Sequence, residues 1–241
     1  MTPTMRKASS TAQKDLRTQA LVLRRTNYGE TDRIISLLTP SGKIDVLAKG
    51  ARKEKSRLAG GIEMFCLSEV VVHQHRPGQG RDAGLATLTA AKMVKFYQNI
   101  LTDLSRLELA SSTLKGVAKL ADQISDAGPF ELLRQVFEAL HEGMNATLVE
   151  TFYLFNLAKI SGEEMNLYFD TRGEKLRADG VYTWNTYESA LEPMENGQIG
   201  VNEIKLMRLI VSAPPATVSK IQQLSESLPV LLNIARSINQ L

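Results

Sequence analysis

The stretch LVLRRTNYGETDRIISLLTPSGKIDVLAKGARKEKSR, residues 21–57, decides the fold class of this chain. It contains three runs in which apolar and polar residues partly alternate. Turn-forming residues separate these runs, at Asn27-Tyr28-Gly29 and again at Thr39-Pro40-Ser41-Gly42. Short alternating runs divided by Gly, Pro and Asn are typical of β-strands joined by tight turns. The stretch therefore predicts consecutive strands of an antiparallel sheet.

The same pattern extends on both sides of this stretch. Five strand-like runs are predicted at 18–26, 30–38, 43–50, 64–75 and 84–90. In the third run Ile44, Val46 and Ala48 alternate with other residues, and in the last run Leu85, Thr87 and Thr89 share one face. Five strands in about 75 residues suit a small closed barrel of the OB type. We expect an N-terminal five-stranded OB-fold β-barrel.

Beyond residue 95 the hydrophobic period becomes helical. In LLRQVFEAL, residues 132–140, the apolar residues Leu133, Val136, Phe137 and Leu140 fall on one stripe. Further helices are predicted at 97–124 with a bend at Gly116, at 146–160 ending at Gly162, at 203–211 capped by Asn202, and from Pro229 onward. The fold class is therefore mixed α+β, a barrel followed by an α-helical C-terminal domain.

These patterns predict three regions: a disordered polar tail at 1–16, a barrel domain at 17–95 and a helical domain at 96–241. Residues 163–198 have no sustained period and form an irregular or hairpin insertion, with short strands near 166–169 and 181–184. No apolar run approaches the roughly 20 residues of a membrane helix, and the tail does not resemble a secretory signal. Cys66 is the single cysteine, which excludes an internal disulfide and favours a cytoplasmic location.

The net charge of +3 conceals a basic front and an acidic back. Residues 1–95 contain 17 Lys and Arg against 8 Asp and Glu, whereas residues 96–241 contain 12 against 18. Basic surface attracts polyanions through counterion release, and local charge density determines the effect. The barrel is therefore the part of the chain expected to bind nucleic acid.

The segment AKGARKEKSR, residues 48–57, is the most basic part of the barrel and follows a strand directly, so we expect an exposed loop. With cations on neighbouring strands it gives the predicted DNA-binding set: Arg24, Arg25, Arg33, Lys43, Lys49, Arg52, Lys53, Lys55 and Arg57. Stacking aromatics are scarce, with Tyr28 and Phe65 in the barrel and Phe96 and Tyr97 just beyond it. This composition predicts sequence-tolerant binding through the phosphate backbone.

Residues 21–57 resemble the opening of RecO-family proteins. The resemblance is carried by the Tyr28-Gly29-Glu30-x-Asp32 turn, Gly42 in the hairpin, Ala48-Lys49-Gly50 before a basic segment with Ser56-Arg57, and Leu85-Ala86-Thr87-Leu88 as the last barrel strand. Tyr28 and Glu30 are interpreted as shaping a turn that closes the barrel rather than as DNA contacts.

The resemblance implies a DNA repair and recombination mediator without a catalytic site or cofactor. Such proteins bind single- and double-stranded DNA, anneal complementary strands, pair with RecR and help load RecA onto strands coated by SSB. A cytoplasmic, nucleoid-associated protein, monomeric when alone, is expected. The helical domain of this family accepts the C-terminal tail of SSB, for which the residues to test are Lys159, Lys205 and Arg208.

Many family members also carry a zinc-binding cysteine cluster in the C-terminal domain. The corresponding residues here, DTRGEKLRADGVYTW at 170–184, contain no cysteine, so no metal is expected. A hairpin there would be held by packing of Tyr168, Phe169, Tyr182 and Trp184 instead.

Two other classes of function remain open. One is an RNA-binding OB-fold protein of translation or ribosome assembly, which would prefer structured RNA. The other is a metal-dependent nuclease that uses His73 and His75, although His141 is the only further histidine. No phosphate loop, HExxH motif or nucleophile elbow is present, and Cys66 in its apolar run is interpreted as a buried hydrophobe.

Overall fold

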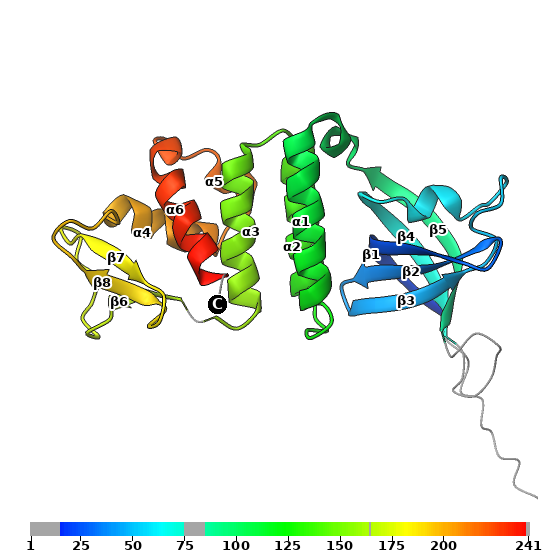
Figure 1. Cartoon of the computed structure of the whole chain (residues 1–241), viewed down its shortest axis with the longest axis horizontal. Helices are drawn as coiled ribbons and strands as arrows, with labels where there is room; N and C mark the ends of the chain where they lie inside the picture. The colour runs from blue at the N-terminus through cyan, green and yellow to red at the C-terminus, as the bar shows by residue number, and fades with distance from the viewer. Residues whose placement is uncertain (1–14, 75–84, 164, 240–241) are drawn as a thin grey trace, which may run out of the picture. The chain divides into compact units, whose positions relative to one another are not determined.

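A computed structural model describes residues 15–74, 85–163 and 165–239 (Figure 1). The chain divides into two compact units. One comprises the residues up to 37 together with 44–94, and the other comprises 38–43 together with 95–241. Most of the expected tail, residues 1–14, lies outside the described residues, but Asp15 and Leu16 already belong to the first strand.

The first unit contains the barrel. Its strands are β1 (Asp15–Tyr28), β2 (Asp32–Thr39), β3 (Gly42–Ala48), β4 (Cys66–His73) and β5 (Ala86–Phe96), and a short 3-10 helix, η1 (Ala59–Ile62), precedes β4. The strands close in the order β1-β2-β3-β5-β4, with β1 antiparallel to β4 and β3 parallel to β5. This is the closed five-stranded architecture of an OB fold, as the sequence predicts.

Alternation along the strands builds the interior of the barrel. Val46 and Ala48 are fully buried and Ile44 packs against them, as predicted for the third strand. In β5 the buried residue is Leu88, with Ala86 beside the core, so Leu85, Thr87 and Thr89 form the opposite face of the strand. The strand β5 also runs six residues beyond the predicted end at residue 90, because Ala91–Phe96 continue the extended backbone.

The second unit is built on helices η2 (Gln98–Thr102), α1 (Leu104–Leu120), α2 (Gly128–His141), α3 (Ala146–Ile160), α4 (Val201–Ile210), α5 (Pro215–Val218) and α6 (Leu224–Ile238). The helix α2 packs against both α1 and α3, and α6 packs against α3 (Figure 1). The predicted stripe of α2 is confirmed, since Leu133, Val136, Phe137 and Leu140 are all fully buried. Within the described residues no helix combines the length and apolar character needed to span a bilayer.

Three details of the helix prediction are wrong. The helix predicted at 97–124 is instead the 3-10 helix η2 followed by α1, which ends at Leu120. Gly116 lies inside α1 and makes room for the Tyr153 hydroxyl, which would lie 2.0 Å from an added Cβ. The helix α4 is capped by Gly200, whose N–H donates to Glu203 Oε2 over 3.0 Å, and not by Asn202. Pro229 lies inside α6 and does not start it, because the helix begins at Leu224.

The weakly patterned region forms a three-stranded sheet in the order β6-β8-β7, made of β6 (Asn166–Asp170), β7 (Tyr182–Asn185) and β8 (Ala190–Pro193). The sequence does not predict β8. Leu167, Tyr182 and Leu191 are buried, whereas Tyr168 is 60% and Phe169 is 47% exposed. Those two aromatic side chains therefore do not hold the sheet together as expected, because their positions in β6 face solvent.

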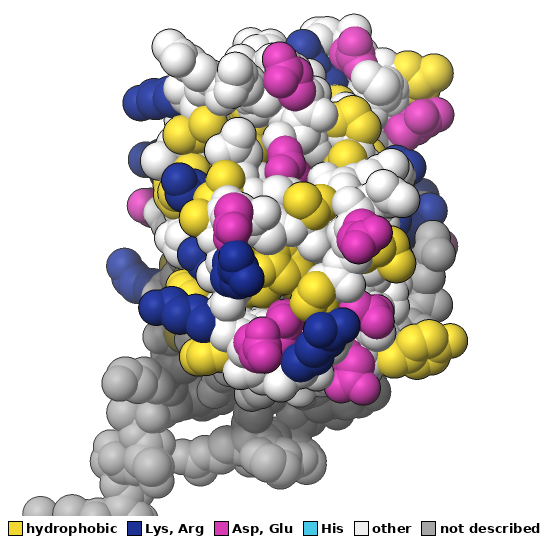
Figure 2. All heavy atoms as spheres, turned by 90° about the vertical axis from the view of Figure 1, so that its left-hand side faces the viewer, with side chains coloured by type: hydrophobic (Ala, Val, Ile, Leu, Met, Phe, Trp, Pro, Cys, Tyr) yellow, Lys and Arg dark blue, Asp and Glu magenta, His cyan; other side chains and the backbone are white. Residues whose placement is uncertain are grey.

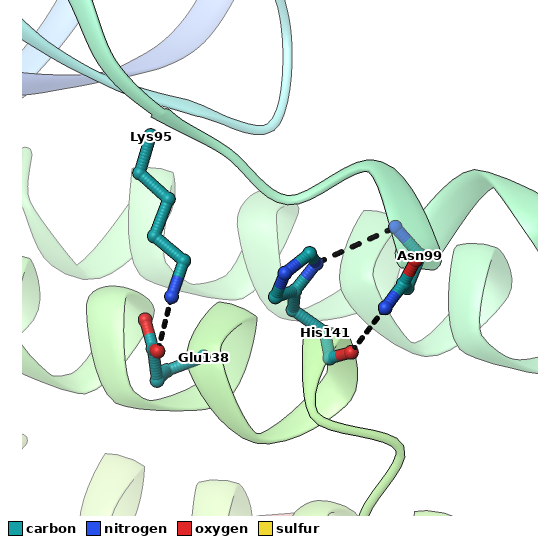
Figure 3. Close-up of polar contacts among 4 residues, drawn as sticks. All are labelled: Lys95, Asn99, Glu138 and His141. Atoms are coloured by element: carbon teal, nitrogen blue, oxygen red, sulfur yellow. Dashed lines mark hydrogen bonds and ion pairs between the residues drawn. The ribbon is translucent and has the colours of Figure 1, made fainter.

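The segment that enters the helical unit is fixed to the end of α2 (Figure 3). Lys95 forms an ion pair with Glu138, and the amide of Asn99 donates to the main-chain oxygen of His141 over 2.8 Å. Tyr97, between them in sequence, is 1% exposed and packs edge-on against Phe137 with ring centroids 5.7 Å apart. These contacts make residues 95–99 a rigid part of the helical unit.

Candidate nucleic-acid interface

The turn between β1 and β2 organises the basic loop that follows β3. Gly29 has a left-handed backbone, with φ of 57°, and Asp32 opens β2. The carboxylate of Asp32 accepts hydrogen bonds from the Gly50 N–H over 2.7 Å and from the Thr31 hydroxyl over 2.9 Å. These bonds, chiefly the one from Gly50, lower the pKa of Asp32. The start of the loop is therefore tied to the turn through an ionised carboxylate.

Arg52 makes the second connection between the loop and the turn. Its N–H donates to the Thr31 carbonyl over 2.8 Å, and its guanidinium donates to the Gly29 carbonyl over 3.2 Å. Residues 29–32 and 50–52 are thus hydrogen-bonded to each other. The two sequence motifs that resemble the RecO family, at Tyr28–Asp32 and Ala48–Gly50, therefore meet in the fold. Tyr28 and Glu30 are exposed at this turn. The basic loop leaves the barrel from a fixed base.

The remaining cations of the loop face solvent. Lys49, Lys53, Lys55 and Arg57 are all exposed. Among the described residues, no ion pair involves Lys53, Lys55 or Arg57. Charges in this arrangement are available to an incoming polyanion without the breaking of an internal pair.

The predicted cations on the strands differ in their availability. Arg24 is exposed, whereas the Arg25 guanidinium is 2.6 Å from Glu63. Arg33 donates to the Asn27 side chain over 3.4 Å. Lys43 belongs to the turn segment that groups with the helical unit, where its ammonium lies 2.5 Å from Asp122. The loop therefore presents more unpaired charge than the strands beside it.

Two of the four aromatic candidates for base stacking are buried. Phe65 is 8% exposed and Tyr97 is 1% exposed, so neither ring is open to a base. Tyr28 and Phe96 are exposed by 44% and 36%. The shortage of stacking rings is thus greater than the sequence indicates.

The three cations selected in the helical unit have different surroundings. The guanidinium of Arg208 donates twice to the Leu167 carbonyl, over 3.0 and 2.7 Å, and lies 4.4 Å from the centroid of the Tyr168 ring. Lys159 donates to the Val211 carbonyl over 2.8 Å and lines a hollow that also contains Phe152. Lys205 lines another hollow with Leu206 and Ile221. Around the three-stranded sheet the surface mixes both charges with scattered apolar side chains (Figure 2).

The histidines and the cysteine considered for metal binding or nucleophilic catalysis do not form such a site within the described residues. His73 lies 2.8 Å from the Asp15 carboxylate, and His75 lies outside the described residues. No group of three or more His, Cys, Asp or Glu side chains within the described ranges could hold a metal ion. Burial raises the pKa of the Cys66 thiol to about 11, which leaves it protonated and unreactive at neutral pH.

A closed five-stranded barrel bearing an anchored cationic loop defines an OB-fold protein. Comparison with known proteins narrows this class. The family described as "Recombination protein O N terminal" matches residues 14–97. A "DNA repair protein RecO" of Dehalococcoides mccartyi (strain CBDB1) is 31% identical over 204 residues, which are 81% of this chain and 78% of the relative.

Two further relatives with the same name support this assignment. That of Heliobacterium modesticaldum is 28% identical over 86% of this chain and 77% of its own length. That of Roseiflexus sp. (strain RS-1) is 32% identical over 63% of this chain and 52% of its own length. The chain belongs to the RecO family.

Proposed function

We propose that the protein is a DNA repair and recombination mediator that binds single- and double-stranded DNA and anneals complementary strands without catalysing a chemical step. The observation that carries this proposal is the basic loop, whose exposed Lys53 and Lys55 stand on a base fixed by Asp32 and Arg52. Membership of the RecO family adds the biological setting, since the relatives are named DNA repair proteins.

Annealing follows from electrostatics alone. Cations between two phosphate backbones reduce their repulsion and raise the local concentration of both strands. Strands held by phosphate contacts keep their bases free to pair, whereas strands held by stacking do not. The burial of Phe65 and Tyr97 fits this demand, because it leaves few rings to compete for the bases.

The protein would work with RecR to help load RecA on SSB-coated strands in the cytoplasm, as a monomer near the nucleoid. The acidic C-terminal tail of SSB would bind the helical unit. Lys159 and Lys205 are the cations to test first, because each lines a hollow that also offers apolar side chains. Arg208 is a third candidate; like Lys159, which donates to the Val211 carbonyl, it already donates to a main-chain carbonyl, that of Leu167.

The proposal is tested by fluorescence anisotropy of a labelled single strand titrated with protein at several salt concentrations. Lys53→Gln/Lys55→Gln should weaken binding equally for unrelated sequences and lower the log–log salt slope by about 0.7 per lost single-strand contact. Lys115→Gln/Lys119→Gln removes the same charge from exposed sites on α1 and should leave binding unchanged. Tight binding to structured RNA with no binding to DNA would overturn the proposal.

A further inference from the structure

A hollow of about 610 Å³ opens on the barrel, and Arg57 is the one member of the predicted set of cations among its lining residues. Its lining comes from Arg17–Gln19 of β1, Glu69–Val71 of β4, Thr89–Lys92 of β5 and the pair Arg57-Leu58. We call these residues the wall groove. Since β4 lies between β1 and β5 in the strand order, β4 supplies the floor of the wall groove and the other two strands supply its flanks.

The register of the strands explains the shape of the wall groove. Arg17 is paired with Val71, and Gln19 is paired with Glu69. On the other flank the Thr89 hydroxyl donates to the Val71 carbonyl over 3.0 Å, which holds β5 beside β4. Val71 is therefore a short floor residue, with the long Arg17 side chain beside it on β1 and the short Thr89 side chain beside it on β5.

Basic charge predominates along this channel. Arg17 and Lys92 stand on opposite flanks and Arg57 comes from the basic loop, and all three side chains are exposed. Among the described residues, none of the three takes part in an ion pair. Glu69 is the one carboxylate among the described residues of the lining. The described part of the wall groove therefore has a net positive charge.

Gly61 fixes the position of Arg57 beside this channel. A Cβ at Gly61 would lie 2.5 Å from the main-chain carbonyl carbon of Ala91, so only glycine lets η1 lie this close to β5. The Gly61 N–H donates to the Leu58 carbonyl over 3.0 Å, which ties the end of the basic loop to the same place. Arg57 therefore connects the loop with the wall groove.

The chemistry of the lining favours a phosphate backbone over an acidic peptide. Arg, Lys, Thr and Gln side chains are the usual partners of phosphate oxygens, and Arg17, Lys92, Thr18 and Gln19 supply all four types. Apart from Leu58, the apolar side chains of the lining are valine and alanine, which offer little depth for the side chains of a peptide. The described lining contains no aromatic ring, so bases in this channel would remain unstacked.

We propose that the wall groove is a second binding path for the phosphate backbone of a single strand, so that one barrel holds two strands at once. This inference rests on the proposed function. The loop and the wall groove give the barrel two cationic surfaces, and Arg57 lies where they meet. Two strands on one barrel would meet within a single complex, and annealing would not require two protein molecules.

The buried Cys66 permits a direct test by site-specific labelling, since its thiol is inaccessible and its pKa is raised to about 11. Ala90→Cys places a photocrosslinker on an exposed position of the wall groove, and Lys220→Cys places the same group on the helical unit as a control. The probe is an oligothymidylate of about eight nucleotides, within the site size of one OB barrel.

Each variant has a defined expectation. The wild-type barrel should crosslink the probe at residue 90 and the control should not. Crosslinking at residue 90 should persist in Lys53→Gln/Lys55→Gln and be lost in Arg17→Gln/Lys92→Gln, which should also anneal more slowly. Glu69→Gln removes the opposing carboxylate and should raise crosslinking about two- to fivefold, the size of a surface charge interaction.

The outcomes separate the two proposals. Failure of residue 90 to crosslink in a protein that binds the probe through its loop, or unchanged annealing by a folded Arg17→Gln/Lys92→Gln variant, overturns the second path and leaves the proposed function intact. Failure of the wild-type protein to bind single-stranded DNA at low salt overturns both.

Discussion

The carboxylate of Asp32, at the start of β2, accepts a hydrogen bond of 2.7 Å from the main-chain N–H of Gly50, eighteen residues further along the chain. Gly50 has φ of 65°, a left-handed conformation that glycine adopts at little cost. One side chain thus holds the base of the loop in a backbone shape that other residues rarely adopt. Together with the two hydrogen bonds of Arg52, this bond holds the base of the loop that carries Lys53 and Lys55.

Two substitutions at Asp32 separate the hydrogen bond from the charge. Asp32→Ala and Asp32→Asn both remove one negative charge, but only asparagine keeps an acceptor for Gly50. We expect the Gly50 amide to exchange about fivefold faster or more in Asp32→Ala, which corresponds to a bond of about 1 kcal/mol, and to stay protected in Asp32→Asn. Hydrogen exchange followed by NMR measures this, and equal protection in the two variants would contradict the anchoring role.

The same bond makes the protection of the Gly50 amide depend on pH in the acidic range. Since the pKa of Asp32 is lowered in the folded protein, its stabilising contribution is complete above the ordinary value of about 3.9 and is lost as pH falls through the lower folded value. Protection of the Gly50 amide, corrected for its intrinsic exchange rate, should be constant from neutral pH to about pH 4 and decline below it. Asp32→Asn should show no such decline at this amide; a decline beginning near pH 6 would exclude Asp32 as its cause.

Arg208 is expected to stabilise the contact between α4 and the three-stranded sheet. Its two bonds to the Leu167 carbonyl and its position over the Tyr168 ring are lost in Arg208→Ala, which should cost about 1.5–2 kcal/mol in urea unfolding. Arg208→Lys retains the charge but not the planar fork and should recover less than half of the loss. A wild-type midpoint for Arg208→Ala would show that the contact contributes nothing to stability.

Metal removal should have no effect on this family member. The turn after β6 is organised without cysteine, because the Asp170 carboxylate accepts from the N–H groups of Arg172 and Glu174 over 2.9 Å each. Incubation with EDTA should leave the melting temperature unchanged, and elemental analysis should find zinc far below one per chain. Stoichiometric zinc, or a lower melting temperature after chelation, would show that a metal site exists.

Local patterns in the sequence predict much of this fold, and the failures have physical causes. The buried stripe of α2 and the alternation of β3 are regular, so their elements are predictable. Strand β8 is short and has no pattern of its own, because its pairing with β6 and β7 creates it. Pro229 does not mark a helix boundary, because α6 begins at Leu224 and continues through it.

The candidate site could also be predicted only in part from the sequence. A dense run of cations identifies the basic loop, but a linear sequence does not reveal that Arg25 and Lys43 are paired with Glu63 and Asp122. Arg17 and Lys92 were not predicted, because neither belongs to a dense run of cations in the sequence. The OB strand order, which places β4 between β1 and β5, is the signal that could have brought them together.

Strand annealing by the barrel is tested most directly by the annealing rate of two complementary oligonucleotides, one of them fluorescent, with the purified protein and with neither nucleotide nor divalent metal. We expect acceleration that declines as salt is added, is reduced in Lys53→Gln/Lys55→Gln and is unchanged in Lys115→Gln/Lys119→Gln. An uncatalysed rate in the presence of wild-type protein at low salt, or acceleration that requires a metal ion, would contradict it.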